Sequence, residues 1–186
     1  GVNLNKFRSK FYPKDINFTF LYMGRIIKEK GVLELIKAAS ILKKRHSNLI
    51  FNFIGDFDPK KNSRKLNKFF YISIKKNIIN YHGYIQNVSK FVNNSHAVVL
   101  PSYREGLSHS LLVSASMSRP LIASDVPGCR DLVIDGHNGY LFKSKDGAFG
   151  VFRIEPNGDL TAVAGAENGK RTDFPKEKQF TLKKIE

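Results

Sequence analysis

The sequence is poor in several kinds of residue, and each shortage excludes a class of protein. It holds one cysteine, Cys129, so no disulfide can form within the chain, and a reducing compartment is favoured. It has no apolar run of about 18 residues, the length that a membrane-spanning helix needs. Its five histidines show no spacing typical of a metal site. We therefore expect a cytoplasmic globular protein that binds no metal.

Acidic residues are scarce in the first half of the chain only. The 186 residues include 31 Lys and Arg against 16 Asp and Glu, a net charge of +15. Residues 1–94 hold 19 basic and 5 acidic residues, whereas residues 95–186 hold 12 and 11. A one-sided basic region suggests an anionic partner, such as a nucleic acid, a membrane surface or a phosphorylated ligand. A solvated lysine-rich surface is the alternative that the composition leaves open.

Short apolar segments alternate with helix-like segments over the first two-thirds of the chain. The expected strands are Phe18–Met23, Leu49–Ile54, Ile78–His82, Ala97–Leu100 and Pro120–Ser124. The expected helices lie at residues 32–45, 59–76, 87–94 and 108–118. This alternation predicts an α/β fold with a Rossmann-like, doubly wound and mostly parallel sheet.

The alternation stops near Asp146. Residues 147–186 carry 5 of the 14 glycines and no helical periodicity. Val151–Glu155 and Leu160–Val163 flank Pro-Asn-Gly-Asp, an arrangement typical of a β-hairpin. We therefore divide the chain into a domain of residues 1–146 and a divergent tail of residues 147–186, either β-rich or disordered.

Chemically useful residues follow the predicted strands, and parallel sheets bind ligands beyond the carboxyl ends of their strands. Gly24 and Arg25 follow the first strand and Lys30 precedes a helix, where cations and open backbone suit a diphosphate. After the fourth strand, Glu105 can accept hydrogen bonds from hydroxyls, and the amides of 106–108 can hold phosphate. Ordinary lysines and an ordinary acidic residue near helix starts are the alternative interpretation.

Two further segments carry weaker signals. Ser124–Asp131 and Ile134–Gly139 are rich in turn-forming residues, and both are expected to be tight loops. A basic residue stands next to three aromatic residues at Lys68-Phe69-Phe70-Tyr71, a combination that can bind single-stranded nucleic acid. A partly buried helix is the favoured interpretation of that stretch.

In this order and at these spacings, the segments resemble the C-terminal domain of family 4 retaining glycosyltransferases, which have the GT-B fold. The resemblance extends from Gly1 to about Lys145. It is carried by Phe20–Gly31, Val98–Leu112, Arg119–Asp131 and Asp135–Phe142. It implies a domain that binds a UDP- or GDP-linked sugar as donor substrate and uses no cofactor.

The resemblance also assigns roles to individual positions. Arg25 and Lys30 match the basic pair on the diphosphate, and Glu105 matches the first glutamate of a paired motif that contacts the donor sugar. These three are the expected catalytic residues. The expected donor-binding positions are Gly24, Gly83, Tyr84, Gly106, Leu107, Ser108 and Val113, with Gly83 and Tyr84 near the nucleobase.

The sequence departs from the family pattern at three points. Val113 stands where the second glutamate is expected, and losing its charged hydrogen bonds should weaken donor binding at least about tenfold. The N-terminal acceptor domain has no counterpart, and residues 147–186 do not resemble the closing helices.

We expect a glycosyltransferase fragment for retaining transfer to a glycan or lipid-linked acceptor in polysaccharide biosynthesis, with little activity alone. The alternative is a catalytically inactive nucleotide-sugar-binding module or a decayed enzyme.

The remaining lysines also suggest a partner. Near an anionic membrane each is worth about 1 kcal/mol, so peripheral contact with such a membrane is expected. A nucleic-acid partner is not expected, because no recognised nucleic-acid-binding motif is present.

Overall fold

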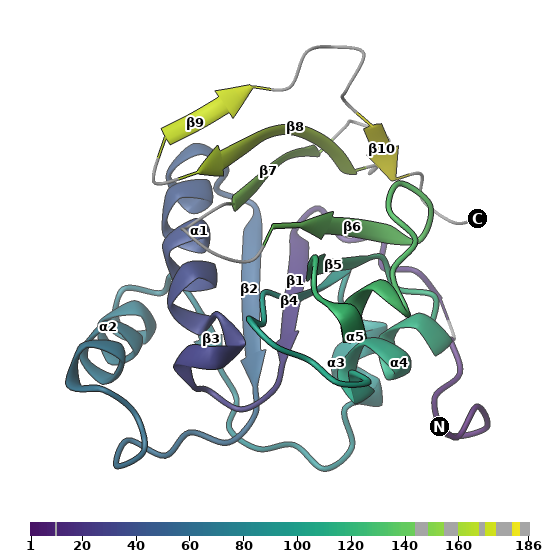
Figure 1. Ribbon diagram of the computed structural model, residues 1–186, viewed down its shortest axis with the longest axis horizontal. Coiled ribbons are helices and arrows are strands. Elements are labelled where there is room, and N and C mark those ends of the chain that lie inside the picture. Colours follow the sequence, from purple (N-terminus) through teal and green to yellow (C-terminus); the bar gives the residue numbers. More distant parts are fainter. Residues whose placement is uncertain (10, 144–148, 155–159, 168–169, 174–179, 183–186) are drawn as a thin grey trace.

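The computed structural model describes residues 1–9, 11–143, 149–154, 160–167, 170–173 and 180–182 (Figure 1). The predicted boundary at residue 146 and the predicted turn Pro-Asn-Gly-Asp lie outside the described residues. The division of the chain at that boundary therefore stays a prediction.

The main sheet has six strands, all paired in parallel (Figure 1). They are β1 (Phe18–Met23), β2 (Leu49–Ile54), β3 (Asn80–Tyr81), β4 (Ala97–Leu100), β5 (Leu121–Ser124) and β6 (Gly139–Phe142). Their order in the sheet is β3-β2-β1-β4-β5-β6. This is the doubly wound Rossmann order, so the predicted fold class is confirmed.

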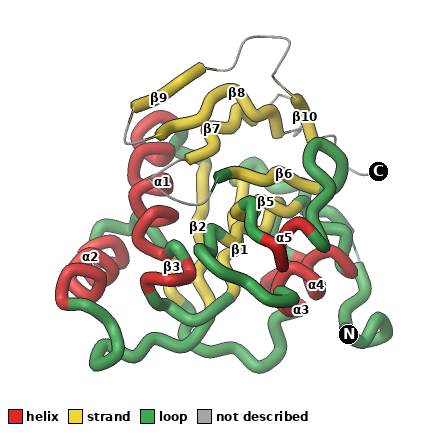
Figure 2. Tube along the Cα trace, in the orientation of Figure 1, coloured by secondary structure: helices red, strands yellow, loops and turns green. Residues whose placement is uncertain are grey.

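Helices cover both faces of this sheet (Figures 1 and 2). The helices α1 (Val32–Arg45) and α2 (Arg64–Lys75) lie on one face. The other face carries the shorter helices α3 (Ser89–Asn93), α4 (His109–Ser116) and α5 (Pro127–Arg130), and a 3₁₀ turn, η1 (Lys28–Lys30), precedes α1. No helix in the described part of the chain is long and apolar enough to cross a membrane.

The core explains why the strands are continuous apolar runs. Every residue of β1, β4 and β5 is buried, because a parallel sheet is covered by helices on both faces. Helix α1 turns one apolar stripe toward the sheet, formed by Val32, Leu35, Ile36 and Ala39. The exposed side of α1 carries Lys37, Lys44 and Arg45 together with Ile41, so burial of the apolar stripe sets the orientation of the helix.

Most predicted elements are confirmed, with boundaries set by local contacts. The third strand is shorter than expected, since only Asn80 and Tyr81 pair with β2. The helix predicted over residues 59–76 begins at Arg64, where the Ser63 hydroxyl accepts a hydrogen bond from the Leu66 amide at 3.2 Å.

Helix α5 and strand β6 were not predicted. Ser124–Asp131 was expected to be a loop, but it contains α5, which begins at Pro127. Proline suits the first helical position, because the amide it lacks would have no partner there. Strand β6 was also missed, since its four residues show no alternation and pairing with β5 alone defines them.

A second sheet follows the first and is antiparallel. Strands β7 (Phe149–Ile154) and β8 (Leu160–Glu167) pair with each other, which confirms the predicted hairpin. Strand β8 also pairs with β9 (Lys170–Asp173) and β10 (Phe180–Leu182), and neither of these was predicted.

Candidate functional site

A cavity of about 270 Å³ opens at the carboxyl ends of the first strands. It is lined by Met23, Gly24, Arg25, Ile54, Gly55, Asp56, Tyr84, Ile85, Val88, His109, Ser110 and Val113. These residues come from the ends of β1 and β2, the segment after β3, and the first turns of α4. The cavity therefore lies beside the β1–β4 boundary, the point where the strand order reverses and doubly wound folds bind ligands.

Arg25 is the cation on this cavity, and the end of β1 holds its backbone in place. Tyr22 is 1% exposed and its hydroxyl donates a hydrogen bond to the Arg25 carbonyl at 2.7 Å. Burial raises the pKa of Tyr22 above its usual range, so the hydroxyl stays protonated and keeps donating. The side chain of Arg25 itself is exposed and free to meet a ligand in the cavity.

The loops after β1 and β2 approach each other closely because Gly55 has no side chain. A Cβ atom on Gly55 would lie 1.8 Å from the Gly24 carbonyl oxygen, and its φ of +145° disfavours other residues. The Gly24 amide donates to the Ile54 carbonyl at 3.0 Å, and the Tyr81 hydroxyl donates to the Gly55 carbonyl at 2.9 Å. The floor of the cavity is thus a rigid backbone junction.

Lys30 and Glu105 form an ion pair beside the cavity. The Lys30 Nζ lies 2.5 Å from the Glu105 Oε1, and their side chains are only 19% and 10% exposed. The backbone brings the two loops together, since the Tyr103 amide donates to the Glu29 carbonyl at 2.8 Å. The Ser102 hydroxyl reaches the same carbonyl at 3.3 Å. Sequence reasoning placed both residues at the site and missed their contact with each other.

Tyr103 also lies where the loops that carry Lys30 and Glu105 meet, close to Glu34 of α1. Burial, followed by the hydrogen bond and the charge of Glu34, raises the pKa of Tyr103 to about 12. The hydroxyl is therefore protonated at neutral pH. The loop that carries Glu105 is held at its start by the hydrogen bond from the Tyr103 amide to the Glu29 carbonyl.

The same loop is held at its other end by close packing. A Cβ atom on Gly128 would lie 1.4 Å from the Gly106 carbonyl oxygen, so α5 touches the loop backbone directly. Ser108 then caps α4, and its hydroxyl accepts a hydrogen bond from the Leu111 amide at 3.4 Å. Gly106 and Leu107 between these points are exposed, with open space on the Cα of Gly106.

The structure brings four of the ten predicted site residues onto the cavity. Gly24, Arg25, Tyr84 and Val113 line it, and Val113 is a wall residue that is 1% exposed. Gly83 does not line the cavity, but its carbonyl accepts a hydrogen bond from the amide of the lining residue Gly55 at 2.9 Å. The others are Lys30 and Glu105 in their ion pair, and Gly106, Leu107 and Ser108 in the adjoining loop.

Several lining residues were missed. Asp56 follows β2 just as Arg25 follows β1, so its position at the carboxyl edge was the signal that could have found it. His109 and Ser110 line the cavity from the start of α4. Ile85 and Val88 carry no pattern of their own, because the segment after β3 is irregular.

The arrangement suits a ligand that is apolar at one end and anionic at the other. Met23, Ile54, Ile85, Val88 and Val113 supply an apolar wall, which favours a flat ring or aliphatic group. Arg25 supplies a cation to the same lining, which also includes the Asp56 carboxylate. Across the described ranges no three His, Cys, Asp or Glu residues gather closely enough to hold a metal ion.

Curated relatives of this chain are glycosyltransferases. The capsular polysaccharide biosynthesis glycosyltransferase CapM of Staphylococcus aureus is 29% identical over 146 residues, which cover 76% of this chain and 37% of the relative. The Escherichia coli UDP-Gal:alpha-D-GlcNAc-diphosphoundecaprenol alpha-1,3-galactosyltransferase is 26% identical over 158 residues, 78% of this chain and 40% of the relative. The chain thus spans about two-fifths of the length of these proteins.

Solved structures show the same fold. The C-terminal domain of a glycosyl transferase group 1 family protein from Francisella tularensis aligns with a TM-score of 0.66 at 22% identity, covering 79% of this chain and 82% of that domain. Anabaena HepE in complex with UDP and glucose aligns with a TM-score of 0.64 at 19% identity, covering 77% and 41%. The family model of glycosyl transferases group 1 matches residues 5–149, and the chain therefore belongs to that family.

Proposed function

We propose that residues 1–146 form the nucleotide-sugar-binding half of a retaining glycosyltransferase that acts in the cytoplasm. The donor is a UDP- or GDP-linked sugar, and the acceptor is a glycan or a lipid-linked glycan bound by an N-terminal acceptor domain. Family membership supports the proposal, as do two structural neighbours that hold UDP together with a sugar. Relatives that are named for diphosphoundecaprenol substrates support the lipid-linked acceptor.

The cavity at the strand reversal is the observation that carries this proposal. Its apolar wall suits a nucleobase and ribose, and Arg25 stands where a diphosphate would follow. Tyr84, 74% exposed on the rim, is placed to cover the base. The cavity therefore offers separate surfaces for the two ends of a nucleotide.

The chemistry follows from the charge that develops during transfer. The bond between the anomeric carbon and the diphosphate oxygen breaks, its electron pair leaves with the diphosphate, and the sugar gains oxocarbenium character. Arg25 and Lys30 would stabilise the charge on the departing oxygens, helped by the amides that begin α4. The acceptor oxygen attacks the anomeric carbon from the face that the diphosphate leaves, and it passes its proton to the diphosphate. Because attack and departure occur on the same face, the anomeric configuration is retained.

Glu105 has two roles in this scheme. Its carboxylate would accept hydrogen bonds from the donor sugar hydroxyls, and it holds Lys30 in place through their ion pair. Because one carboxylate oxygen already faces Lys30, the second is the one available to the sugar. The exposed backbone of Gly106 and Leu107 lies next to it for further contacts.

A second candidate function is binding without turnover. Val113 is an apolar wall residue where the family resemblance expects a glutamate, so this cavity cannot offer a carboxylate to the ribose hydroxyls at that point. A transfer assay on the intact chain, with lipid-linked and soluble glycan acceptors, separates the enzyme from the binding module.

A thermal-shift panel of UDP-, GDP- and ADP-sugars tests donor binding. A ligand present at about 100 times its dissociation constant should stabilise the fold by roughly 2.7 kcal/mol. Arg25→Gln should weaken the affinity about tenfold to a hundredfold, since it removes a charged hydrogen bond. Lys28→Gln is the matched control, because Lys28 is exposed in η1 and does not line the cavity. If none of these nucleotides stabilises the protein, the proposal is wrong.

A further inference from the structure

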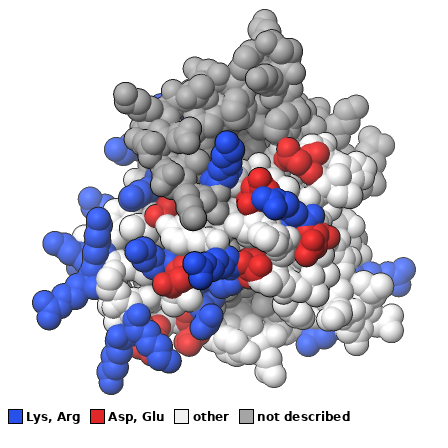
Figure 3. All heavy atoms as spheres, viewed as in Figure 1, with Lys and Arg blue, Asp and Glu red and all other residues white. Residues whose placement is uncertain are grey.

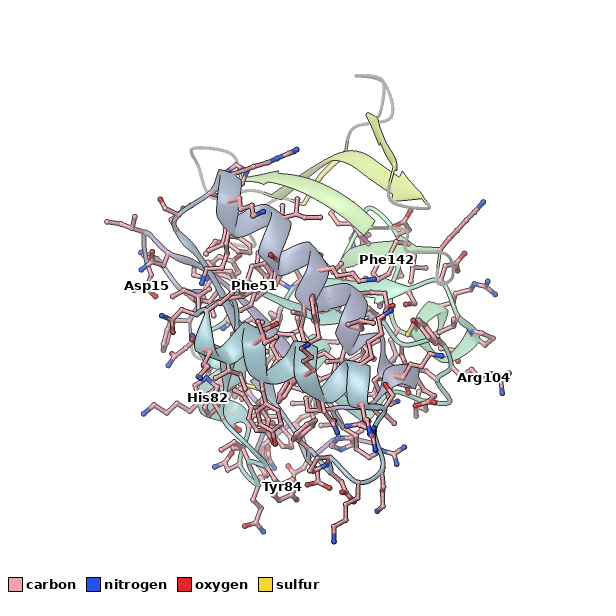
Figure 4. All side chains as sticks on the ribbon, turned by 90° about the vertical axis from the view of Figure 1, so that its left-hand side faces the viewer. Asp15, Phe51, His82, Tyr84, Arg104 and Phe142 are labelled. Atoms are coloured by element: carbon pink, nitrogen blue, oxygen red, sulfur yellow. The ribbon has the colours of Figure 1, made fainter. Side chains whose placement is uncertain are left out.

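The outer surface of α1 and α2 forms a broad basic face. The two helices lie side by side in front of the sheet (Figure 4). Their exposed cations are Lys37, Lys44, Arg45, Arg64, Lys65, Lys68 and Lys75, and Lys76 adjoins the end of α2. We call these residues, with the exposed Ile41, Tyr71 and Ile72, the α1–α2 face. Figure 3 shows the Lys and Arg atoms gathered at the side of the molecule where α2 lies.

Almost nothing acidic balances this charge. Glu34 is the one carboxylate in the two helices, and it is half-buried against Tyr103 rather than on the outer surface. None of the eight cations forms an ion pair with a described residue. The potential over this face is therefore strongly positive, and it faces solvent.

Apolar side chains stand between these cations. Ile41, Tyr71 and Ile72 are 50%, 53% and 37% exposed, although each sits on a helix that has a buried side available. On α2, Tyr71 and Ile72 lie one turn after Lys68 and one turn before Lys75, so lysines flank them on both sides. Long lysine side chains can extend past such residues and keep their charge in water or among headgroups.

We propose that the α1–α2 face binds the surface of an anionic membrane. The cations would meet phosphate headgroups, while Ile41, Tyr71 and Ile72 enter the boundary between headgroups and acyl chains. Interleaved basic and apolar side chains on a helix that lies flat are the pattern that such a surface selects. This face is separate from the donor cavity, since Tyr84 on the cavity rim lies below both helices in Figure 4.

The burial of the aromatic residues argues against single-stranded nucleic acid as the occupant. Phe70 is 0% exposed and packs on Phe57 inside the protein, and Phe69 is half-buried. Only Tyr71 of this aromatic run is available for stacking, whereas binding of successive bases needs several rings. The two isoleucines on the same face, Ile41 and Ile72, offer a nucleic acid neither a charge for its phosphates nor a ring on which its bases could stack.

Vesicle sedimentation with the intact chain tests the charge component. We expect binding to vesicles containing phosphatidylglycerol and little binding to phosphatidylcholine alone. Each basic residue near an anionic surface is worth about fivefold in affinity, so Lys65→Gln/Lys68→Gln/Lys75→Gln should bind about a hundredfold more weakly. The matched control is Lys6→Gln/Lys14→Gln/Lys90→Gln, which removes three exposed lysines outside these helices and has the same net charge. Equal loss in both variants would overturn the proposal.

Tyrosine 71 allows a direct test of insertion. The chain contains no tryptophan, so Tyr71→Trp creates a single fluorescent reporter on the face. Its emission should shift to the blue when vesicles containing phosphatidylglycerol are added. Phe11→Trp is the matched reporter, 54% exposed and outside both helices, and its emission should stay unchanged. A shift at position 11 alone would mean that a different surface touches the lipid.

Two further measurements separate this proposal from its alternatives and from donor binding. Binding to a single-stranded oligonucleotide should not fall in Tyr71→Ser/Ile72→Ser, whereas vesicle binding should fall about tenfold. If the oligonucleotide binds the intact chain and vesicles do not, the face is a nucleic-acid surface and the proposal fails.

The triple lysine variant should keep its thermal shift with nucleotide sugars, so loss of lipid binding there would not reflect loss of the fold or of the donor site.

Discussion

The two halves of the parallel sheet differ in charge although they share one architecture. Residues 1–94, which contain β1 to β3, carry 19 basic and 5 acidic residues. Residues 95–143, which contain β4 to β6, carry four of each, the cations being Arg104, Arg119, Arg130 and Lys143. Both halves use parallel strands covered by helices, so the fold does not require the difference.

Each half brings different groups to the candidate site. The basic half supplies Arg25 and Lys30, while the neutral half supplies Glu105 and the start of α4. Both halves use hydrogen bonds and close backbone packing to position these groups. In the basic half, Tyr22 donates to the Arg25 carbonyl and Gly55 packs on Gly24. In the neutral half, the Tyr103 amide donates to Glu29 and Gly128 packs on Gly106. The candidate site exists only where the two halves meet, at the β1–β4 boundary.

The largest effect is expected in the neutral half, where packing decides the position of Glu105. Gly128→Ala would place a Cβ atom 1.4 Å from the Gly106 carbonyl oxygen, so the loop or α5 must move. We expect a loss of about 3 kcal/mol in the free energy of unfolding, measured by chemical denaturation. The control is Gly106→Ala, where nothing lies within 4 Å and the change should be about 0.5 kcal/mol or less. Equal effects at both positions would show that the contact does not hold the loop.

An intermediate effect is expected for the pair that joins the halves. A double-mutant cycle with Lys30→Met and Glu105→Gln should give a coupling energy of about 2 kcal/mol, because both side chains are largely shielded from water. Denaturation of the four proteins measures it. The control cycle uses Arg130 and Asp125, a pair that lies within the neutral half and is more exposed, at 55% and 37%, and its coupling should be much smaller. Similar values would mean that the Lys30–Glu105 contact does not link the halves.

The smallest effect concerns the wall of the cavity. Val113→Glu adds to the neutral half a carboxylate that can meet the ribose hydroxyls of a donor. It should tighten nucleotide-sugar binding at least about tenfold by calorimetry. In the control Val113→Gln, the new side chain has the size of glutamate but no charge, and the affinity for the nucleotide sugar should rise less. Unchanged affinity in Val113→Glu would contradict the assignment of this wall to the ribose.

The sequence predicted the fold better than it predicted the site. Strands such as Phe18–Met23 were found because burial on both faces demands an unbroken apolar run. Arg25, which lines the cavity, was singled out because it lies two residues after the end of such a strand. The Lys30–Glu105 pair was not foreseen, since 75 residues separate the partners and tertiary contacts, such as the one between Glu29 and Tyr103, align their loops. Strand β6 was missed because an edge strand of four residues has no pattern apart from its partner.

By itself the sequence determined the α/β class, the parallel sheet, the uneven charge and the family to which the chain belongs. These follow from local patterns, in which burial sets the residue type at each position. Only the tertiary structure decided that Arg25, Tyr84 and Val113 share one cavity, and that the lysines of α1 and α2 share one face. Such groupings depend on how strands and helices from distant parts of the chain pack together, and no local pattern records which distant side chains become neighbours.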